Sequence, residues 1–409
     1  MLTATRPSGF LTNIADNFRT HIVAPNFREQ CTSDDGENCR LPLSMLFGVA
    51  ARQSLGVALS VSKKILFAAG WNLRNRSVVG IRQTISYFSK SILLKISADN
   101  SQIRNSLYEF SYEYLRNRAK KNPISFNDKI IFRMAYDRNP IFPILADKIA
   151  VRNYVKDCVG EEYLIPTLAV TDAPRLIDWE KLPNEFVCKV NHGSGGLIGV
   201  HFGVENEALL PSKFDLLKWQ RYWVNPEKFN QSSASGMLSK WMSMNYEWQA
   251  GRSPEWAYKN IKPAIIIEKL LMNDNSTIAL QTQLYVFNGR VRLIRTAGRN
   301  KDGSRTMTYF SPSWEFLPVG YTDGNKFLQP NPLIKKPKLL PELVSIAEAL
   351  ASNLDFARVD LFDLGNEVKF GEITIYPSAG EGFWSPRDFS FELGSYWDLD
   401  LSMRERNHA

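Results

Sequence analysis

Residues 356–375 read FARVDLFDLGNEVKFGEITI, and this stretch decides the fold that the sequence predicts. Two runs rich in apolar and β-branched residues flank a short Gly-Asn turn, which predicts a β-hairpin. Because side chains alternate across a strand, Arg358 and Asp360 should share one face of the first strand. Glu372 and Thr374 should share one face of the second strand. A tight turn can bring the two sets together.

The two carboxylates Asp360 and Glu372 allow two interpretations. Charged groups inside such strands are costly unless they are paired or bound to metal. Mg²⁺ prefers carboxylate oxygens together with substrate phosphates, so the pair can form a metal site. Alternatively, Arg358 makes a structural ion pair with one of the two. The hairpin taken alone does not separate these interpretations.

A glycine-rich segment lies upstream of this hairpin. Residues 186–190 (FVCKV) predict a strand that carries Lys189 and leads into NHGSGG at 191–196. A lysine in this place can reach phosphate oxygens, and the glycines let backbone N–H groups approach the same anion. The spacing is neither that of a Walker A loop nor that of a dinucleotide fingerprint. An ordinary β-turn is the competing interpretation, and His192 is given no catalytic role.

A second strand signal lies between the glycine-rich segment and the hairpin. Residues 264–271 (AIIIEKLL) predict a buried strand with Glu268 near its end. This glutamate can accept a hydrogen bond from an adenine amino group, or it can face water. Residues 281–287 and 290–296 flank Asn-Gly, the strongest short signal for a β-hairpin. Helices are predicted over residues 147–159 and 341–353.

The order of these signals along the chain resembles the TupA-like ATP-grasp family, which is associated with teichuronopeptide and cell-surface polysaccharide biosynthesis. The resemblance runs from about residue 128 to residue 396. The matching stretches are DKIAVRNYV at 147–155, GEEYLIP at 160–166, FVCKVNHGSG at 186–195, KPAIIIE at 262–268, FNG at 287–289, RVDL at 358–361 and FGEITIYPSAG at 370–380.

The resemblance implies an α+β chain with the ATP-grasp fold, in which two α+β subdomains clamp ATP, preceded by a mainly helical, basic N-terminal region. Residues 1–120 form that N-terminal region, and 121–185 form the part before the ATP-grasp core. Residues 186–270 form the small subdomain, with the glycine-rich loop and an insertion or lid. Residues 271–409 form the large subdomain, with the Mg-binding hairpin.

The same resemblance implies ATP and Mg²⁺ as cofactors and assigns their ligands. Lys189 would bind ATP phosphate, and the loop of Ser194, Gly195 and Gly196 would fold over it. Glu268 and Leu270 would form the adenine hinge. The residues expected to bind two Mg²⁺ ions are Asp360, Glu372 and Thr374.

Two arginines are the expected catalytic residues, and one position departs from the family pattern. Arg358 would steady the charge that develops at the reacting centre. Gln283 stands where the family carries a lysine on the strand before Phe-Asn-Gly. Arg295, Arg299 or Arg305, after the hairpin, would replace that lysine, and Arg299 is the one predicted as catalytic.

The implied reaction is ADP-forming ligation of a carboxylate to an amine through an acyl phosphate. The expected partners are a carboxylate-bearing glycan or amino acid and an amino compound, as in modification of a capsule or cell-envelope polysaccharide. Two alternatives stay open. One is an ATP-grasp phosphotransferase that acts on a sugar hydroxyl, and the other is a non-catalytic nucleotide-binding module of a polysaccharide assembly complex.

The charge of the 409-residue chain is +8, and its positive excess is concentrated in residues 51–121, which carry thirteen Lys and Arg against three Asp and Glu. Such a region is either the solvated face of a helical domain or a docking surface for the inner leaflet of a membrane. No motif points to nucleic acid. The sequence shows neither a signal peptide nor a membrane span, so a cytoplasmic location is expected. The four cysteines are expected to be free thiols.

Overall fold

The computed structural model describes residues 122–406, except for gaps at 206, 216, 248–254, 274–276, 300–304, 324–325, 329 and 381. The chain divides into two compact units, residues 1–111 and 112–409, and every described residue belongs to the second unit. The basic N-terminal region predicted over 1–120 therefore lies outside the described residues.

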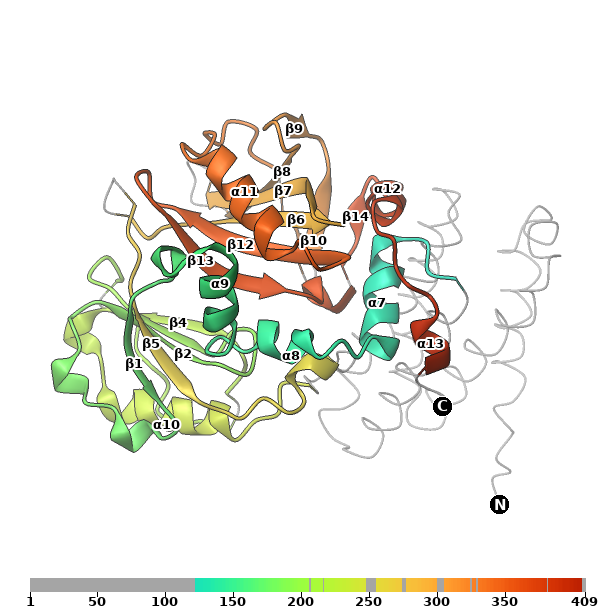
Figure 1. The fold of residues 1–409 in the computed structure, drawn as a ribbon. Coiled ribbons are helices and arrows are strands. Elements are labelled where there is room, and N and C mark those ends of the chain that lie inside the picture. The colour runs from blue at the N-terminus through green and yellow to red at the C-terminus, as the bar shows by residue number, and fades with distance from the viewer. Residues whose placement is uncertain are drawn as a thin grey trace, which may run out of the picture. The chain divides into compact units, whose positions relative to one another are not determined.

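The described part of the second unit contains two large sheets with their covering helices, and one small sheet (Figure 1). The helices are α7 (Phe126–Tyr136), α8 (Ile141–Ala146), α9 (Val151–Val159), α10 (Gln231–Met242), α11 (Leu340–Leu350), α12 (Phe389–Ser395) and α13 (Met403–Arg406). The strands are β1 (Thr167–Thr171), β2 (Phe186–Val190), β3 (Leu197–Val200), β4 (Arg221–Val224), β5 (Ile265–Lys269), β6 (Gln281–Phe287), β7 (Arg290–Arg299), β8 (Arg305–Phe310), β9 (Phe316–Leu317), β10 (Gly320–Asp323), β11 (Lys326–Phe327), β12 (Phe356–Asp363), β13 (Val368–Thr374) and β14 (Trp384–Ser385).

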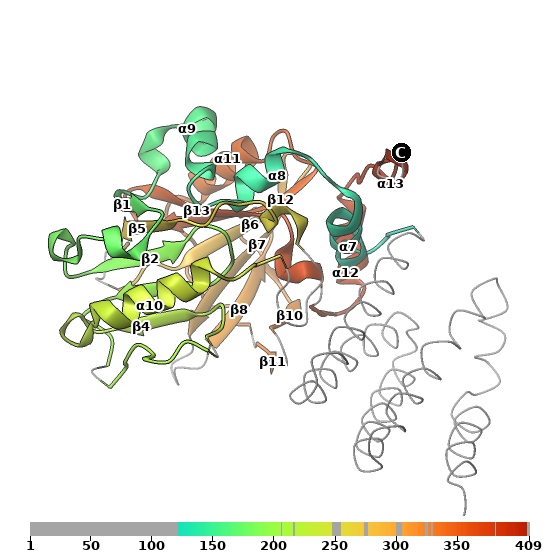
Figure 2. The ribbon, with the colours of Figure 1, turned by 90° about the horizontal axis from the view of Figure 1, so that it is seen from below.

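The five-stranded sheet has the order β1-β5-β2-β3-β4, with α10 along its outer side (Figure 2). The helix begins at the cap residue Asn230, whose side chain accepts a hydrogen bond of 2.8 Å from the backbone N–H of Ser233. Its fully buried Trp241 packs with Ile265 and Ile267 of β5 in one apolar cluster. Burial of side chains of this size contributes about 1.5–3 kcal/mol each.

The six-stranded antiparallel sheet has the order β13-β12-β6-β7-β8-β9, with α11 packed on β12, β6 and β7. The predicted Asn288-Gly289 hairpin joins β6 to β7, and both turn residues have positive φ angles of 47° and 72°. This turn geometry matches the right-handed twist of the flanking strands, so the sequence prediction is confirmed.

Two expected boundaries differ from the observed elements. The five-stranded sheet already begins at β1, before residue 186, because β1 pairs with β5. The segment after the glycine-rich loop, expected as an insertion or lid within residues 186–270, supplies β4 and α10 to this sheet layer. The helix predicted over 147–159 begins only at Val151, and it ends at Gly160 as predicted.

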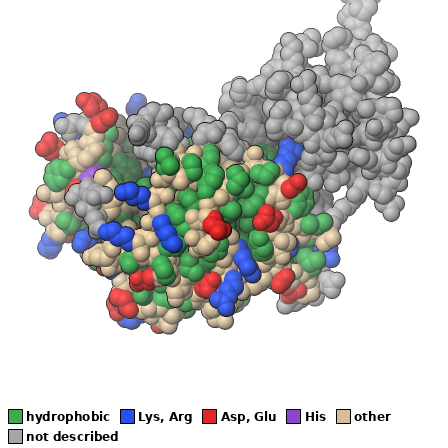
Figure 3. All heavy atoms as spheres, turned by 90° about the horizontal axis from the view of Figure 1, so that it is seen from above, with side chains coloured by type: hydrophobic (Ala, Val, Ile, Leu, Met, Phe, Trp, Pro, Cys, Tyr) green, Lys and Arg blue, Asp and Glu red, His purple; other side chains and the backbone are tan. Residues whose placement is uncertain are grey.

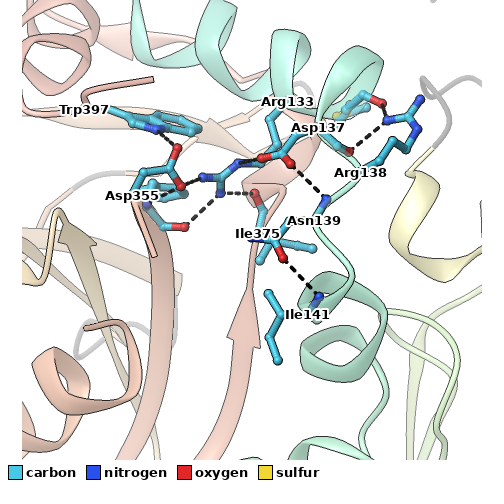
Figure 4. A network of polar contacts seen from close by, with 10 residues as sticks. Arg133, Asp137, Arg138, Asn139, Ile141, Asp355, Ile375 and Trp397 are labelled. Atoms are coloured by element: carbon cyan, nitrogen blue, oxygen red, sulfur yellow. Dashed lines mark hydrogen bonds and ion pairs between the residues drawn. The ribbon is translucent and has the colours of Figure 1, made fainter. Parts of the chain in front are cut away.

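A buried arginine on α7 joins the ends of β12 and β13 (Figure 4). Arg133 donates a hydrogen bond of 2.8 Å to the carbonyl of Phe356 and one of 3.4 Å to that of Ile375. Its guanidinium pairs with Asp355 and lies 4.4 Å from the ring centre of Trp397. Because Phe356 opens β12 and Ile375 follows β13, this network fixes the ends of the strands that carry the predicted metal ligands.

The described surface in Figure 3 mixes charges of both signs, with Lys and Arg side chains interspersed among Asp and Glu. Within the described residues, no helix is long and apolar enough to cross a membrane. Cys158 and Cys188 are free thiols, as predicted, and Cys31 and Cys39 lie outside the described residues.

Candidate functional site

The hairpin of β12 and β13 brings together the two sets of side chains that the sequence placed on one face of each strand. Arg358 lies opposite Thr374, and Asp360 lies opposite Glu372. An irregularity in the register follows Asp360, so the regular pairing of the site residues ends there.

Arg358 is the centre of this group. Its Nε donates to Asp360 Oδ1 at 2.7 Å, and its Nη2 donates to Asp360 Oδ2 at 2.8 Å. The same Nη2 donates to Glu372 Oε1 at 3.0 Å and to the hydroxyl of Thr374 at 2.9 Å. All three predicted metal ligands therefore surround one guanidinium group.

Burial and charge act on the two carboxylates in opposite ways. Burial raises the pKa of Asp360 to about 6, and the charge of Glu372 adds to this, whereas Arg358 opposes it. Burial would also raise the pKa of Glu372, but four cations outweigh it and hold this pKa below its ordinary value. Asp360 is 0% exposed, whereas the side chain of Glu372 is 30% exposed, so Glu372 is the carboxylate that an incoming ligand reaches first.

The chemistry of this donor set fits Mg²⁺. Two carboxylates and one hydroxyl already converge on the positive charge of Arg358, and Mg²⁺ takes oxygen ligands of these kinds together with phosphate. Within the described residues, no group of three His, Cys, Asp or Glu side chains is placed to hold a metal. The remaining ligands would therefore come from the Thr374 hydroxyl, water and phosphate.

Gln283 and Arg295 extend the site along the six-stranded sheet. Gln283 pairs with Asp360 on one side and with Arg295 on the other. Its amide nitrogen donates to Asp360 Oδ2 at 2.6 Å, and its amide oxygen accepts from Nε of Arg295. Gln283 therefore connects a second arginine to the buried carboxylate.

The five-stranded sheet supplies a second charged group. Lys189 of β2 forms an ion pair of 2.7 Å with Glu268 of β5. Arg152 of α9 forms one of 3.1 Å with the other oxygen of the same carboxylate. Glu268 is buried with both oxygens paired, so it does not face water, and an adenine amino group would have to share it with these cations.

The glycine-rich segment forms the loop between β2 and β3. Gly195 and Gly196 have φ angles of +86° and +56°, a region that side chains adopt at a cost. A Cβ atom on Gly195 would lie 2.8 Å from the backbone carbonyl of Trp219, so only glycine fits there. Ser194 is exposed at the loop, where it is accessible to a ligand.

Lys148 lies beside this loop, and no sequence motif marked it as a functional residue. Its ammonium group donates to the carbonyl of Gly193. Asp147 accepts a hydrogen bond of 2.9 Å from the Asn191 side chain, which fixes the segment before α9 against the loop. Burial lowers the pKa of Lys148 to about 8, against the attraction of Glu372. The sequence signal that could have pointed to Lys148 is its place in the family-matching stretch DKIAVR at 147–152.

The two charged groups act on one another. Lys148, Lys189 and Arg221, all from the part of the chain around the five-stranded sheet, help to lower the pKa of Glu372 on the six-stranded sheet. The predicted phosphate-binding lysine and the predicted metal-binding carboxylates therefore belong to one site. Such a mixture of carboxylates and cations suits a metal–phosphate complex.

Two predicted residues remain less defined. Leu270 is buried and follows the last residue of β5. The backbone of Arg299 ends β7 opposite Arg305, but the side chains of both arginines lie outside the described residues. Of the three arginines expected to replace the missing lysine, Arg295 is the one with a described side chain, and it contacts Gln283.

Comparison with known protein families identifies the family to which the chain belongs. The model of the TupA-like ATP-grasp family matches residues 128–398, which is about two-thirds of the chain. The chain belongs to this family, and its second unit has the ATP-grasp fold. The comparison with curated proteins gave no match.

Solved structures of ATP-grasp ligases are similar to the chain at low identity. D-alanine–D-alanine ligase from Bacillus anthracis complexed with ATP is 13% identical, with 65% of this chain and 67% of that chain covered and a TM-score of 0.31. N5-carboxyaminoimidazole ribonucleotide synthetase from Thermus thermophilus is 11% identical, with 59% and 48% covered and a TM-score of 0.29. The ATP-grasp ligase PsnB complexed with a minimal precursor, Mg and ADP is 9% identical, with 70% and 66% covered and a TM-score of 0.31. The chain spans about half to three-fifths of the length of the structures first matched.

Proposed function

We propose that the protein is an ATP-dependent ligase that joins a carboxylate to an amine and releases ADP and phosphate. The observation that carries the proposal is the single site in which Lys148, Lys189 and Arg221 act on Glu372 of the Arg358-centred group. Family membership supports the same activity.

The residues divide the work of this reaction as follows. Lys148 and Lys189 hold the ATP phosphates together with the glycine-rich loop. The ammonium group of Lys148 contacts this loop, and that of Lys189, on the strand that leads into the loop, pairs with Glu268. The oxygens of Asp360 and Glu372 would hold Mg²⁺, which when bound would neutralise the charge of those phosphates. Thr374 is the third candidate ligand.

The substrate carboxylate attacks the γ-phosphate of ATP, which gives an acyl phosphate and ADP. An amine then attacks the acyl carbon, and phosphate and a proton leave as the amide forms. Arg358 lies beside the metal ligands, where its guanidinium stabilises the negative charge that develops in both steps. Positioning and electrostatics carry this chemistry, so no enzyme nucleophile is required.

Product analysis tests the proposal. The full-length protein is incubated with ATP, Mg²⁺, an amine and a panel of uronic acids and amino acids. ADP release is measured, and the products are then identified by mass spectrometry. We expect an amide and free phosphate. No ADP release with any pair, together with no binding of Mg·ATP, would contradict the proposal. A phosphorylated sugar would instead favour a phosphotransferase.

A substitution on β12 separates an enzyme from a non-catalytic module. Asp360→Asn should abolish turnover while the protein still unfolds cooperatively. Asp363→Asn is the matched control on the same strand, because Asp363 accepts from the backbone of Gly365 and Leu339, outside the Arg358 group. Unchanged turnover of Asp360→Asn would favour the non-catalytic module.

The substrate and location are further parts of the proposal. The family association supports a capsule or cell-envelope polysaccharide, or its precursor, as the acyl substrate. The positive charge of residues 51–121 supports docking of a cytoplasmic enzyme on the anionic inner leaflet. Deletion of residues 1–120 should weaken binding to anionic liposomes at low salt. Equal binding with and without the segment would refute the docking, and a surface glycan unchanged in mass when the protein is absent would refute the glycan substrate.

A further inference from the structure

Arg295 is a partly buried cation on the six-stranded sheet that the proposed reaction does not yet use. It lies in a cross-strand row that runs Glu372, Asp360, Gln283, Arg295 and Tyr309. The lysines of the glycine-rich side act on Glu372, at the first end of this row. Because neighbouring strands are about 4.8 Å apart, Arg295 is about 10 Å from Asp360 along the sheet, on the side away from those lysines.

The guanidinium of Arg295 is oriented but not neutralised. Its Nε is taken by the amide oxygen of Gln283. Among the described residues, no Asp or Glu forms an ion pair with it. Asp360 is the acid among the leading influences on its charge, and Asp360 is already paired with Arg358. A guanidinium that is partly shielded from water is costly without an anion, so this positive charge favours binding of one.

Two tyrosines border the guanidinium, and Tyr309 forms a side-chain hydrogen bond with it. Tyr285 and Tyr309, on the two neighbouring strands, are buried, whereas Arg295 itself remains partly exposed. Tyr285 also acts on Arg358, so the ring lies near both guanidinium groups. The partly exposed Arg295 therefore belongs to the same site as the carboxylates. It lies toward the end of the row opposite to Glu372, on which the lysines act.

We infer that Arg295 binds an anionic group of the substrate, with Gln283 as the residue that positions it. The inference rests on the proposed function and adds the class of substrate. In addition to the reacting carboxylate, the substrates carry a further carboxylate or phosphate, either on the acid or on the amine. A planar guanidinium with its Nε fixed presents its remaining N–H groups as a fork, which matches an oxyanion in a bidentate way.

Anion titration of the full-length protein tests this inference. The probes are succinate, propionate and glycine, each compared with NaCl at equal ionic strength, with and without Mg·AMP-PNP, and thermal unfolding reports binding. Tighter binding of succinate than of propionate assigns the further anion to the acid. Tighter binding of glycine than of propionate assigns it to the amine substrate.

Variants on β7 decide whether Arg295 is responsible. Arg295→Met should weaken binding of the tightest-binding probe roughly tenfold or more, since a charge-assisted hydrogen-bonded pair is lost. Arg292→Met is the matched control, because Arg292 is an exposed arginine of the same strand, and it should leave the affinity unchanged. If Arg295→Met does not fold, Arg295→Lys is used instead. Its affinity for the probe should be at least about threefold lower, because lysine does not present a fork of N–H groups.

Equal anion affinity of wild type and the Arg295 variant overturns the inference, as does the absence of any anion binding to the wild type at millimolar concentrations. Loss of Mg·AMP-PNP binding in Arg295→Met also overturns it, because Arg295 would then belong to the nucleotide side. Failure of the proposed ligase reaction is a separate result, since it is read from ADP release, whereas the titration without nucleotide still reports on Arg295.

Discussion

Lys148→Met tests the part of the site that tertiary structure alone revealed. Methionine keeps the apolar length of the side chain and removes the ammonium that borders the glycine-rich loop. We expect the variant to bind Mg·AMP-PNP about tenfold to a hundredfold more weakly, which corresponds to loss of a hydrogen bond between charged groups. Its stability without nucleotide should hardly change.

The stability estimate follows from the pKa of Lys148. Burial lowers this pKa from 10.5 to about 8, and one pKa unit corresponds to about 1.4 kcal/mol. The full shift would be about 3 kcal/mol, and because water reaches part of the side chain we halve it to about 1.5 kcal/mol. Loss of the hydrogen bond to Gly193 costs about 1 kcal/mol. The free energies of unfolding at pH 7 should therefore agree within about 1 kcal/mol.

The pH dependence carries the sign of the effect. Below pH 8, Lys148 is charged in both the folded and the unfolded state, so wild type bears the full cost of the buried charge. Between pH 8 and 10.5 the unfolded state holds more protons than the folded state, and the stability of wild type rises with pH. The variant lacks this rise, so the difference should shift by about 1.5 kcal/mol in favour of wild type.

Urea unfolding from pH 7 to 10 measures the stability, and calorimetric titration with Mg·AMP-PNP measures the affinity. Lys148→Arg is the control, because arginine stays charged throughout. The nucleotide affinity of wild type should fall as the pH rises above 8, whereas that of Lys148→Arg should not. Equal nucleotide affinity of wild type and Lys148→Met, or a stability difference that does not depend on pH, would refute the reasoning.

Three further outcomes are expected. Arg133→Met should lower the free energy of unfolding by about 3–5 kcal/mol in urea, because Asp355 loses its buried partner, and a loss below about 1 kcal/mol would contradict this. Gly195→Ala should destabilise the protein by about 1–3 kcal/mol and weaken nucleotide binding, because φ there is +86° and the carbonyl of Trp219 blocks a Cβ atom. An unchanged thermal midpoint of the variant would contradict this prediction. Mg²⁺ should raise the thermal midpoint of wild type in the presence of ADP and have less effect on Glu372→Gln, and equal shifts would remove Glu372 from the metal site.

The local elements were largely predictable because their signals are local. The β6–β7 turn needs positive φ at two successive residues, and Asn288-Gly289 is among the few pairs that allow this. The β12–β13 hairpin was predictable because an alternating pattern and a short turn fix which side chains share a face. The pairs Arg358–Thr374 and Asp360–Glu372 follow from that register.

The pairing partners beyond each hairpin were not predictable. The segment expected as an insertion supplies β4, which pairs in parallel with β3 across a loop of about twenty residues, and no periodic signal marks such a contact. The sequence left open whether Glu268 contacts adenine or water. In the structure Arg152, over a hundred residues earlier, donates a hydrogen bond to one of its carboxylate oxygens. The position of such a cation depends on how α9 packs.

The sequence by itself determined the family, the hairpin that carries Arg358, Asp360 and Glu372, and the lysine before the glycine-rich loop, because each is a pattern within a few residues. Tertiary structure alone decided that Lys148 borders that loop and that Arg295 reaches Asp360 through Gln283. These contacts join residues whose proximity is set by sheet order and helix packing. The free energy of a charge depends on its neighbours in space, which a linear pattern does not contain.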